Sequence, residues 1–341
     1  MNPKIIWIID EGSQGHVVQS RGLVRELAKA VPLETFEVQL HTVPTLRFAR
    51  SMTKRLLRLV LRKWMFHFLH PQITLPDSVP DLIVSSGPHS LATIEFLTKF
   101  YGCPSVFVQG TIDVPRGTVT AIMRPFEGCQ RDDYIFIPML FTEITPEVVD
   151  REREAYLSSH AIRPQGTVNT LFIGNSSSKI RFSSADWAGL VRFVNELWES
   201  TGSQWLITTS FRTGRELDDF FKRGINPAAI LEAVWYSKSP RKVTKPFLGL
   251  ADRVFVTMDS LTMLTEAIAS GRPTFAICPL EIREDPSNTH LRYVNGLAEK
   301  GLITRLYPGL TAALPSAPTA ILEIDYSGPI HELIKRIRWK S

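Results

Sequence analysis

The sequence predicts an α/β protein made of two Rossmann-like domains that face each other across a cleft. The chain has 341 residues, more than one hydrophobic core usually organises, so two domains are expected. Short runs rich in β-branched residues alternate with helical patterns, as in proteins with parallel sheets. This alternation starts afresh near residue 168, after a break rich in Ser, Pro and Gly at 158–166.

Hydrophobic periodicity places the expected elements of each half. In the first half we expect strands at 4–9, 35–40, 81–85, 105–109 and 133–138, and helices at 16–30, 46–69, 89–101 and 146–157. In the second half we expect strands at 168–173, 204–209, 253–257 and 273–277, and helices at 184–200, 213–222, 261–270 and 287–300. The domains are therefore predicted at 1–162 and 163–327, with a final helix (328–341) that packs back on the first domain.

Composition favours a cytoplasmic globular protein. Apolar residues make up 44% and charged residues 21% of the chain, and the net charge is only +5. Five apolar residues precede Asp10 and Glu11, too few for a signal peptide, and no apolar run is long enough for a transmembrane helix. The three cysteines (Cys103, Cys129, Cys278) are scattered, which indicates structural thiols and no metal site.

In open α/β sheets, ligands bind at the carboxyl ends of the strands, so polar residues after strands are the candidate sites. The first strand leads into a loop with Gly12 and Gly15, and His16 stands where a helix begins. The loop after 81–85 holds Ser86 and Gly87, and Gln109 and Asp113 follow 105–109. These residues are candidates for a ligand site on the first domain's side of the cleft; a helix-capping loop, a simple turn and a solvated histidine are the structural alternatives.

The second half offers residues suited to an anion. Gly174, Ser176 and Ser177 follow strand 168–173 in a small polar loop that could cradle a phosphate. Ser210 and Arg212 follow strand 204–209, where the guanidinium could hold an anionic ligand or simply lie at the surface.

The stretch 253–271 is the most informative. Helix 261–270 is expected to bury Leu261, Leu264 and Ile268 and to turn Thr262 and Glu266 toward the ligand, since these two are four residues apart. The free N–H groups near Ser260 suit a diphosphate, and Glu266 suits the two hydroxyls of a ribose. Alternatively, Ser260 is only a helix cap and Glu266 is solvated. Asp259 would repel a diphosphate, so we interpret it as a turn-forming residue.

The motifs DEGSQGHVVQSRGL, PDLIVSSG, VFVQG, FIGNSSSK, LITTSFRT, AVW and LADRVFVTMDSLTMLTEAIASGRP resemble, in that order, the Elm-type mitochondrial-fission family. Its bacterial members are treated as candidate glycosyltransferases. His16 and the helix carrying Glu266 are more distantly similar to the peptidoglycan enzyme that adds N-acetylglucosamine to lipid I. The loop Gly-Asn-Ser-Ser-Ser lacks a second glycine, and the segment from Trp235 to Leu248 is unusually basic, so both depart from the pattern.

The resemblance implies a GT-B fold whose second domain binds a nucleotide sugar and whose first domain binds the acceptor. Trp235 would belong to the donor side, and Glu266 would hold the ribose. The implied reaction moves a sugar to a hydroxyl of a lipid-linked acceptor, such as a lipopolysaccharide precursor. His16 is the expected general base, with Asp113 and Glu11 as alternatives. We expect no cofactor, no metal and no nucleic-acid partner. A non-catalytic membrane-recruiting adaptor and a nucleotide-sugar epimerase are the competing functions.

Residues 46–70 contain seven Lys or Arg and no acidic residue. Arg50, Lys54, Arg58 and Arg62 recur at helical spacing, and Trp64 belongs to the apolar side, which is typical of an interfacial helix. We therefore expect peripheral binding to the anionic inner face of the cytoplasmic membrane. A core helix with a solvated basic face is the alternative.

Overall fold

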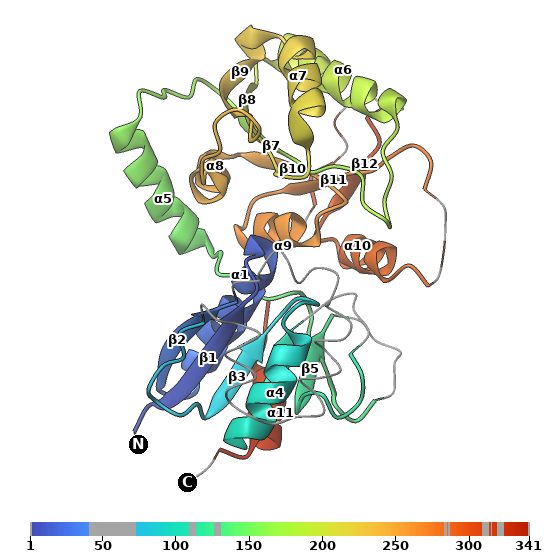
Figure 1. Cartoon of the computed structure of the whole chain (residues 1–341). Helices are drawn as coiled ribbons and strands as arrows, with labels where there is room; N and C mark the ends of the chain where they lie inside the picture. Colours follow the sequence, from blue (N-terminus) through green and yellow to red (C-terminus); the bar gives the residue numbers. More distant parts are fainter. Residues whose placement is uncertain are drawn as a thin grey trace. The chain divides into compact units, whose positions relative to one another are not determined.

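The computed structural model describes residues 2–40, 73–108, 114–125, 131–282, 285, 287–308, 314, 316–318 and 324–339. The chain divides into two compact units (Figure 1): Met1–Glu143 with Ile324–Ser341, and Ile144–Glu323. The expected boundary at 162 differs from this division by one helix, α5 (Pro146–Ser159), which packs on α8 (Thr244–Leu250) of the second unit.

The first unit contains a sheet of six parallel strands in the order β2-β1-β3-β4-β5-β6. Its elements are β1 (Lys4–Asp10), α1 (Gln14–Ala28), β2 (Leu33–Gln39), β3 (Leu82–Ser85), α4 (Leu91–Tyr101), β4 (Ser105–Val108), β5 (Ala121–Arg124), β6 (Tyr134–Phe136) and α11 (Ser327–Ile337).

Alternate residues of β1 enter two different cores, one on each face of this sheet. Ile6 and Ile8 pack with side chains of α1 and α11, whereas Trp7 and Ile9 pack with side chains of α4. Helices thus cover both faces, as the near-continuous apolar strands require. The Tyr326 hydroxyl, just before α11, donates to the Leu140 carbonyl at 3.1 Å and anchors the returning chain.

The second unit contains a second parallel sheet, in the order β12-β11-β10-β7-β8-β9. Its elements, besides α5 and α8, are β7 (Val168–Ile173), α6 (Ser184–Thr201), β8 (Gln204–Thr209), α7 (Gly214–Gly224), η2 (Pro227–Ala229), β9 (Ile230–Val234), β10 (Arg253–Thr257), α9 (Leu261–Ala269), β11 (Thr274–Ile277), α10 (Thr289–Glu299) and β12 (Thr304–Leu306). Aromatic rings of α6 and three strands build its core: Phe193, Trp205, Phe255 and Phe275.

Strand order reverses once in each sheet, and these switch points are where ligands of such folds bind. In the first sheet, β1 lies between β2 and β3, so the reversal falls between β1 and β3. In the second sheet, β7 lies between β8 and β10, so the reversal falls between β7 and β10. The two candidate sites are therefore the loops after β1 and β3, and the loops after β7 and β10.

Five of the described elements were not expected from the sequence: the strands β5, β9 and β12, the helix α8 and the short 3-10 helix η2. Strand β12 is only three residues long, and α8 carries Pro246 and Gly249, which both weaken the helical pattern. Cys103 and Cys278 are buried free thiols. Cys129 and the basic segment 46–69 lie outside the described residues. No helix in the described part of the chain is long and apolar enough to cross a bilayer.

Candidate functional site

At the first switch point, Glu11 and His16 form a close pair. Glu11 follows β1, and His16 lies in the first turn of α1, which begins two residues earlier than expected. The His16 Nδ1 atom lies 2.6 Å from Glu11 Oε1. The Glu11 side chain is 2% exposed and that of His16 is 35% exposed. A buried carboxylate thus fixes a histidine ring that solvent reaches.

The second oxygen of Glu11 caps helix α4. Its Oε2 atom accepts hydrogen bonds from the backbone N–H groups of His89 (2.7 Å) and Ser90 (3.1 Å). Burial acts to raise the pKa of Glu11, but His16 and the His89 donor outweigh it, so the pKa is lowered. Glu11 is therefore ionised at neutral pH, and both of its oxygens are in use. It is placed to orient His16 and poorly placed to act as the alternative base.

Gly87 makes room for this pair, and other small residues bind the backbone around it. Gly87 has φ +99°, and a Cβ there would lie 2.2 Å from Glu11 Oε1 and 2.4 Å from His16 Nδ1. The Ser86 hydroxyl donates to the His16 carbonyl. Gly12 has φ +86°, and its N–H donates to Asp10 Oδ1 at 2.8 Å. Gly15 lies inside α1 and supplies a carbonyl to the Gln19 side chain.

Two predicted residues of this site, Gln109 and Asp113, lie outside the described residues. The sequence reasoning missed His89, whose N–H binds Glu11 and whose side chain is exposed. Its position directly after the Ser86-Gly87 turn was the available signal.

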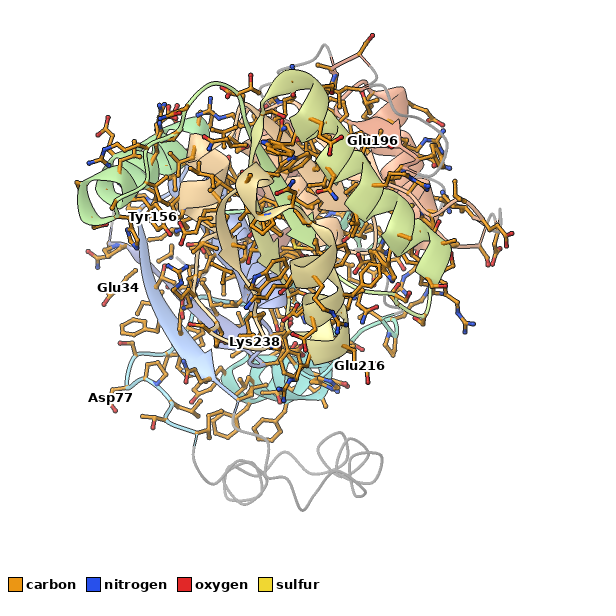
Figure 2. All side chains as sticks on the ribbon, turned by 90° about the horizontal axis from the view of Figure 1, so that it is seen from above. Glu34, Asp77, Tyr156, Glu196, Glu216 and Lys238 are labelled. Atoms are coloured by element: carbon orange, nitrogen blue, oxygen red, sulfur yellow. The ribbon has the colours of Figure 1, made fainter. Side chains whose placement is uncertain are left out.

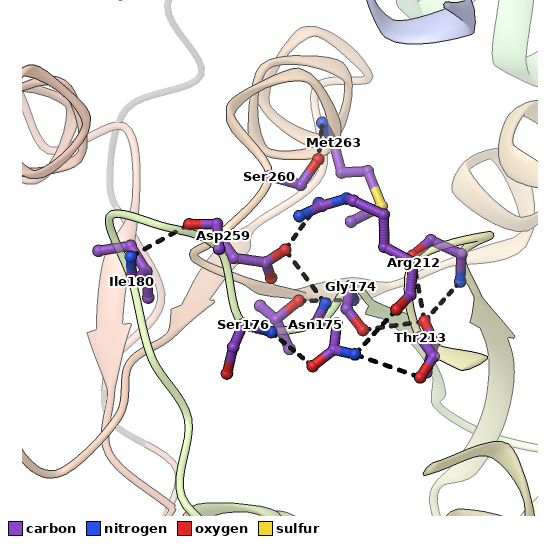
Figure 3. Close-up of polar contacts among 12 residues, drawn as sticks. Gly174, Asn175, Ser176, Ile180, Arg212, Thr213, Asp259, Ser260 and Met263 are labelled. Atoms are coloured by element: carbon purple, nitrogen blue, oxygen red, sulfur yellow. Dashed lines mark hydrogen bonds and ion pairs between the residues drawn. The ribbon is translucent and has the colours of Figure 1, made fainter. Parts of the chain in front are cut away.

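At the second switch point, Asp259 is the centre of a polar cluster (Figure 3). Its Oδ2 atom accepts from Arg212 Nη2 at 2.7 Å and from the Asn175 N–H at 3.1 Å. The Asp259 side chain is 0% exposed and that of Arg212 is 44% exposed. A Cβ on Gly174 would lie 2.3 Å from Asp259 Oδ2, so only glycine leaves space for the carboxylate.

Asp259 lies in the turn after β10, as interpreted from the sequence, but it is also the buried partner of Arg212, which was not anticipated. Burial raises the pKa of Asp259, and the Arg212 charge opposes that rise. The reasoning missed the pairing because the two residues are far apart in sequence.

The loop after β7 is held by its own hydroxyls. Ser176 Oγ accepts from the Phe182 N–H at 2.8 Å, and Ser177 Oγ accepts from the Ile180 N–H at 3.1 Å. Ser210 is linked to this loop through Thr213, whose hydroxyl donates to the Gly174 carbonyl at 2.8 Å. The Gly174 N–H is already bound to Thr257. The phosphate-binding role of this loop stays a prediction. The N–H groups of Gly174, Ile180 and Phe182 already donate within the protein, so they are not available to bind a phosphate.

Helix α9 begins at the same edge. Ser260 is its N-cap and accepts from the Met263 N–H at 3.4 Å. Of its predicted core residues, Leu264 is fully buried, whereas Leu261 and Ile268 are half-buried. Thr262 and Glu266 are also half-buried.

A second buried group, His290, also lies near this edge and was not anticipated. It is 7% exposed, and its Nε2 lies 2.6 Å from the Met258 carbonyl oxygen. Burial lowers its pKa, so the ring is neutral at neutral pH and donates from Nε2 to that carbonyl.

The predicted donor residue Trp235 directly follows β9 and is half-buried, and an exposed aromatic pair lies beside it at this edge. Phe211 is 80% exposed and Tyr236 is 37% exposed, with ring centroids 6.1 Å apart. Among the residues that the structure describes, no three His, Cys, Asp or Glu side chains form a group that could hold a metal ion.

The family model for the mitochondrial fission ELM1 proteins matches residues 14–323. The chain belongs to the mitochondrial fission ELM1 family. No curated protein sequence matches the chain significantly.

Solved structures show which fold this member of the ELM1 family has. S. aureus MnaA in complex with UDP is 12% identical, with a TM-score of 0.52, covering 98% of this chain and 96% of that chain. A Listeria monocytogenes protein assigned as a UDP-N-acetylglucosamine 2-epimerase is 11% identical, with a TM-score of 0.51 and coverages of 99% and 96%. The chain therefore has the predicted α/β fold of two Rossmann-like domains, the GT-B type.

Proposed function

We propose that this protein transfers a sugar from a nucleotide-sugar donor to a hydroxyl of an acceptor, and that the acceptor is lipid-linked, such as a lipopolysaccharide precursor. One observation carries the proposal most directly: a solvent-accessible His16 is fixed by a buried, ionised Glu11 at the first switch point. Sugar transfer needs one such base, since one hydroxyl proton must leave as the new bond forms.

The pair supports a specific proton path. An ionised Glu11 accepts a hydrogen bond from His16 Nδ1–H, which leaves the lone pair on Nε2. Nε2 would take the acceptor's hydroxyl proton while the acceptor oxygen forms a bond to the anomeric carbon of the sugar. The bond from that carbon to the phosphate oxygen breaks, and the nucleotide leaves with the electron pair as a phosphate anion.

The second switch point would bind the donor. Arg212 supplies a positive charge, and the N-terminus of α9 adds backbone N–H groups and the positive end of a helix dipole. Both would stabilise the leaving phosphate without a metal ion. Glu266, on the second turn of α9, would accept hydrogen bonds from the ribose hydroxyls. Activity that survives a chelator supports a metal-independent reaction, whereas activity lost and restored by a divalent ion contradicts it.

Membrane binding through residues 46–69 is a separate part of the proposal, and it rests on the sequence alone. The test is co-sedimentation with vesicles of graded anionic lipid content. The comparison is wild type against a variant with Arg50, Lys54, Arg58 and Arg62 changed to Glu. Loss of binding in the variant, together with salt sensitivity of the wild type, supports the proposal; equal binding of both proteins contradicts it.

The function itself is tested with a panel of UDP-, ADP- and GDP-sugars. A thermal shift of the full chain identifies the donor, and product analysis with and without lipid-linked acceptors follows. Transfer that requires an acceptor supports the proposal. A changed sugar without any acceptor would indicate an epimerase, and no binding by any donor would favour the adaptor function.

A further inference from the structure

A buried carboxylate beside the proposed phosphate site is unexpected, because two like charges repel each other. Asp259 is 5% exposed and lies at the switch point between β7 and β10. Arg212 is the cation that this site offers a phosphate, and its guanidinium is already bound to Asp259 Oδ2 at 2.7 Å. A bound diphosphate would therefore share Arg212 with a carboxylate.

The two oxygens of Asp259 differ. Oδ2 holds both of its partners, Arg212 and the Asn175 N–H (Figure 3). Oδ1 is buried and accepts no hydrogen bond, although the Thr257 hydroxyl lies near the carboxylate. A proton placed on Oδ1 would break none of these contacts and would remove a negative charge from the site.

We propose that Asp259 is a positioning residue that holds Arg212 at the phosphate site and binds a proton on Oδ1 when a diphosphate enters. This inference rests on the proposed donor site. Before the ligand binds, the ionised Asp259 fixes the guanidinium. After it binds, the protonated Asp259 still accepts from Arg212 through Oδ2, but the full positive charge faces the ligand.

The charges around Asp259 agree with this coupling. Arg212, from the loop after β8, is its cationic partner, and the Asp259 charge acts on the pKa of a second titratable group, His290 from α10. Burial has already raised the pKa of Asp259, so it starts closer to neutral pH than an exposed carboxyl. A dianion held by the same guanidinium would raise that pKa further, which draws a proton from solvent.

The test is calorimetry of a nucleotide sugar binding to the full chain, in two buffers of equal pH and different protonation enthalpies. The probes are UDP-glucose, UDP-N-acetylglucosamine and ADP-glucose, because their phosphates are diesters that do not titrate near neutral pH. We expect wild type to take up a fraction of a proton, up to one, on binding. Its Kd should rise with pH, by up to about tenfold per pH unit.

Asp259→Asn imitates the protonated carboxyl, because its oxygen can replace Oδ2 and its amide can replace Oδ1. We expect this variant to bind with no proton uptake and with a flat pH dependence. Arg212→Gln provides a second route: without its cation, Asp259 should already be protonated, so uptake should fall there too. Asp219→Asn, which removes the charged partner of Lys238 from the surface of α7, is the matched control and should keep the uptake of wild type.

Equal proton uptake in wild type and Asp259→Asn would overturn the inference. Uptake that disappears in His290→Gln and persists in Asp259→Asn would assign the proton to His290 and overturn it as well. Binding without proton uptake in wild type would overturn this inference alone. Failure of every nucleotide sugar to bind would overturn the proposed function together with it.

Discussion

At the scale of single residues, Glu11 shows how much a contact between distant segments changes a chemical role. As a sequence position it was a candidate base. In the structure its oxygens are divided between His16 and the N-terminus of α4. The side chain at position 11 can take only one orientation, because the two N–H groups of α4 must face an oxygen atom.

Glu11→Gln should therefore inactivate the histidine while keeping its position. The amide oxygen must face the His89 and Ser90 N–H groups, so the NH₂ group faces His16 Nδ1 and donates to it. The proton on the ring then moves to Nε2, and the base is lost. We expect turnover to fall by about 10²–10⁴-fold with donor affinity nearly unchanged.

Steady-state kinetics and calorimetry on the same preparation separate these two effects. Glu34→Gln on β2 is the matched control, since Glu34 is an exposed carboxylate of the same unit (Figure 2). His16→Ala should lose a similar factor, and the double variant should lose little more. A Glu11→Gln protein with full turnover would show that His16 does not act as an oriented base.

Glu266→Ala should weaken donor binding and leave the fold intact. Losing a charged acceptor for the ribose hydroxyls should cost about 1.5–3 kcal/mol of binding free energy. Calorimetric titration with the donor measures this, and Glu216→Ala, at an exposed glutamate of α7 (Figure 2), is the control. Unchanged affinity in Glu266→Ala would remove this residue from the donor site.

The sequence could place His16, Gly87 and Arg212 at strand ends, because strand ends follow from local patterns. It could not pair Asp259 with Arg212 or Glu11 with the His89 N–H. Those contacts depend on which strands become neighbours, and strand order is not a local property.

At the scale of elements, the helix α5 also shows that local sequence patterns do not predict contacts between distant segments. Its sequence predicts a helix correctly, but not the unit to which it attaches. It packs on α8 so closely that a Cβ on Gly249 would lie 2.1 Å from the Val149 carbonyl oxygen. The Tyr156 hydroxyl of α5 also donates to Glu232 at 2.9 Å.

Gly249→Ala should therefore disturb the contact between α5 and α8. The obstacle is backbone, which cannot move aside as a flexible side chain can, so we expect a loss of about 1–3 kcal/mol in the free energy of unfolding. Gly296→Ala in α10 is the matched control, because a Cβ there meets nothing within 4 Å. It should stabilise the protein by about 0.4–1 kcal/mol.

Chemical denaturation of both variants measures the two effects, with hydrogen exchange to locate the change. Loss of protection in α5 and α8 is expected for Gly249→Ala alone. Equal stability of the two variants would show that α5 and α8 can move apart to fit the added Cβ with no loss in the free energy of unfolding.

At the scale of the whole molecule, each unit repeats one plan: a parallel sheet with a single reversal of strand order and a polar cluster at that reversal. Alternation of strands and helices made this fold class predictable. The missed strands β5, β9 and β12 lie at or next to sheet edges, where short strands carry weak patterns. The chain also leaves the first unit at residue 143 and returns at residue 324.

The returning helix α11 completes the core of the first unit, so changes in the last residues of the chain should act on its first strands. Leu333 is 0% exposed and belongs to the same core cluster as Ile6 and Val84. Leu333→Ala should lower the stability of that core by about 2–5 kcal/mol. Hydrogen exchange should then rise in β1, β3 and α1, while β7, β8 and β10 of the second unit keep their protection. Lys335→Ala, an exposed position on the same helix, controls for changes in helix propensity. If Leu333→Ala instead raised exchange equally in both sheets, the two units would unfold together. The two compact units would then not be independent units of stability.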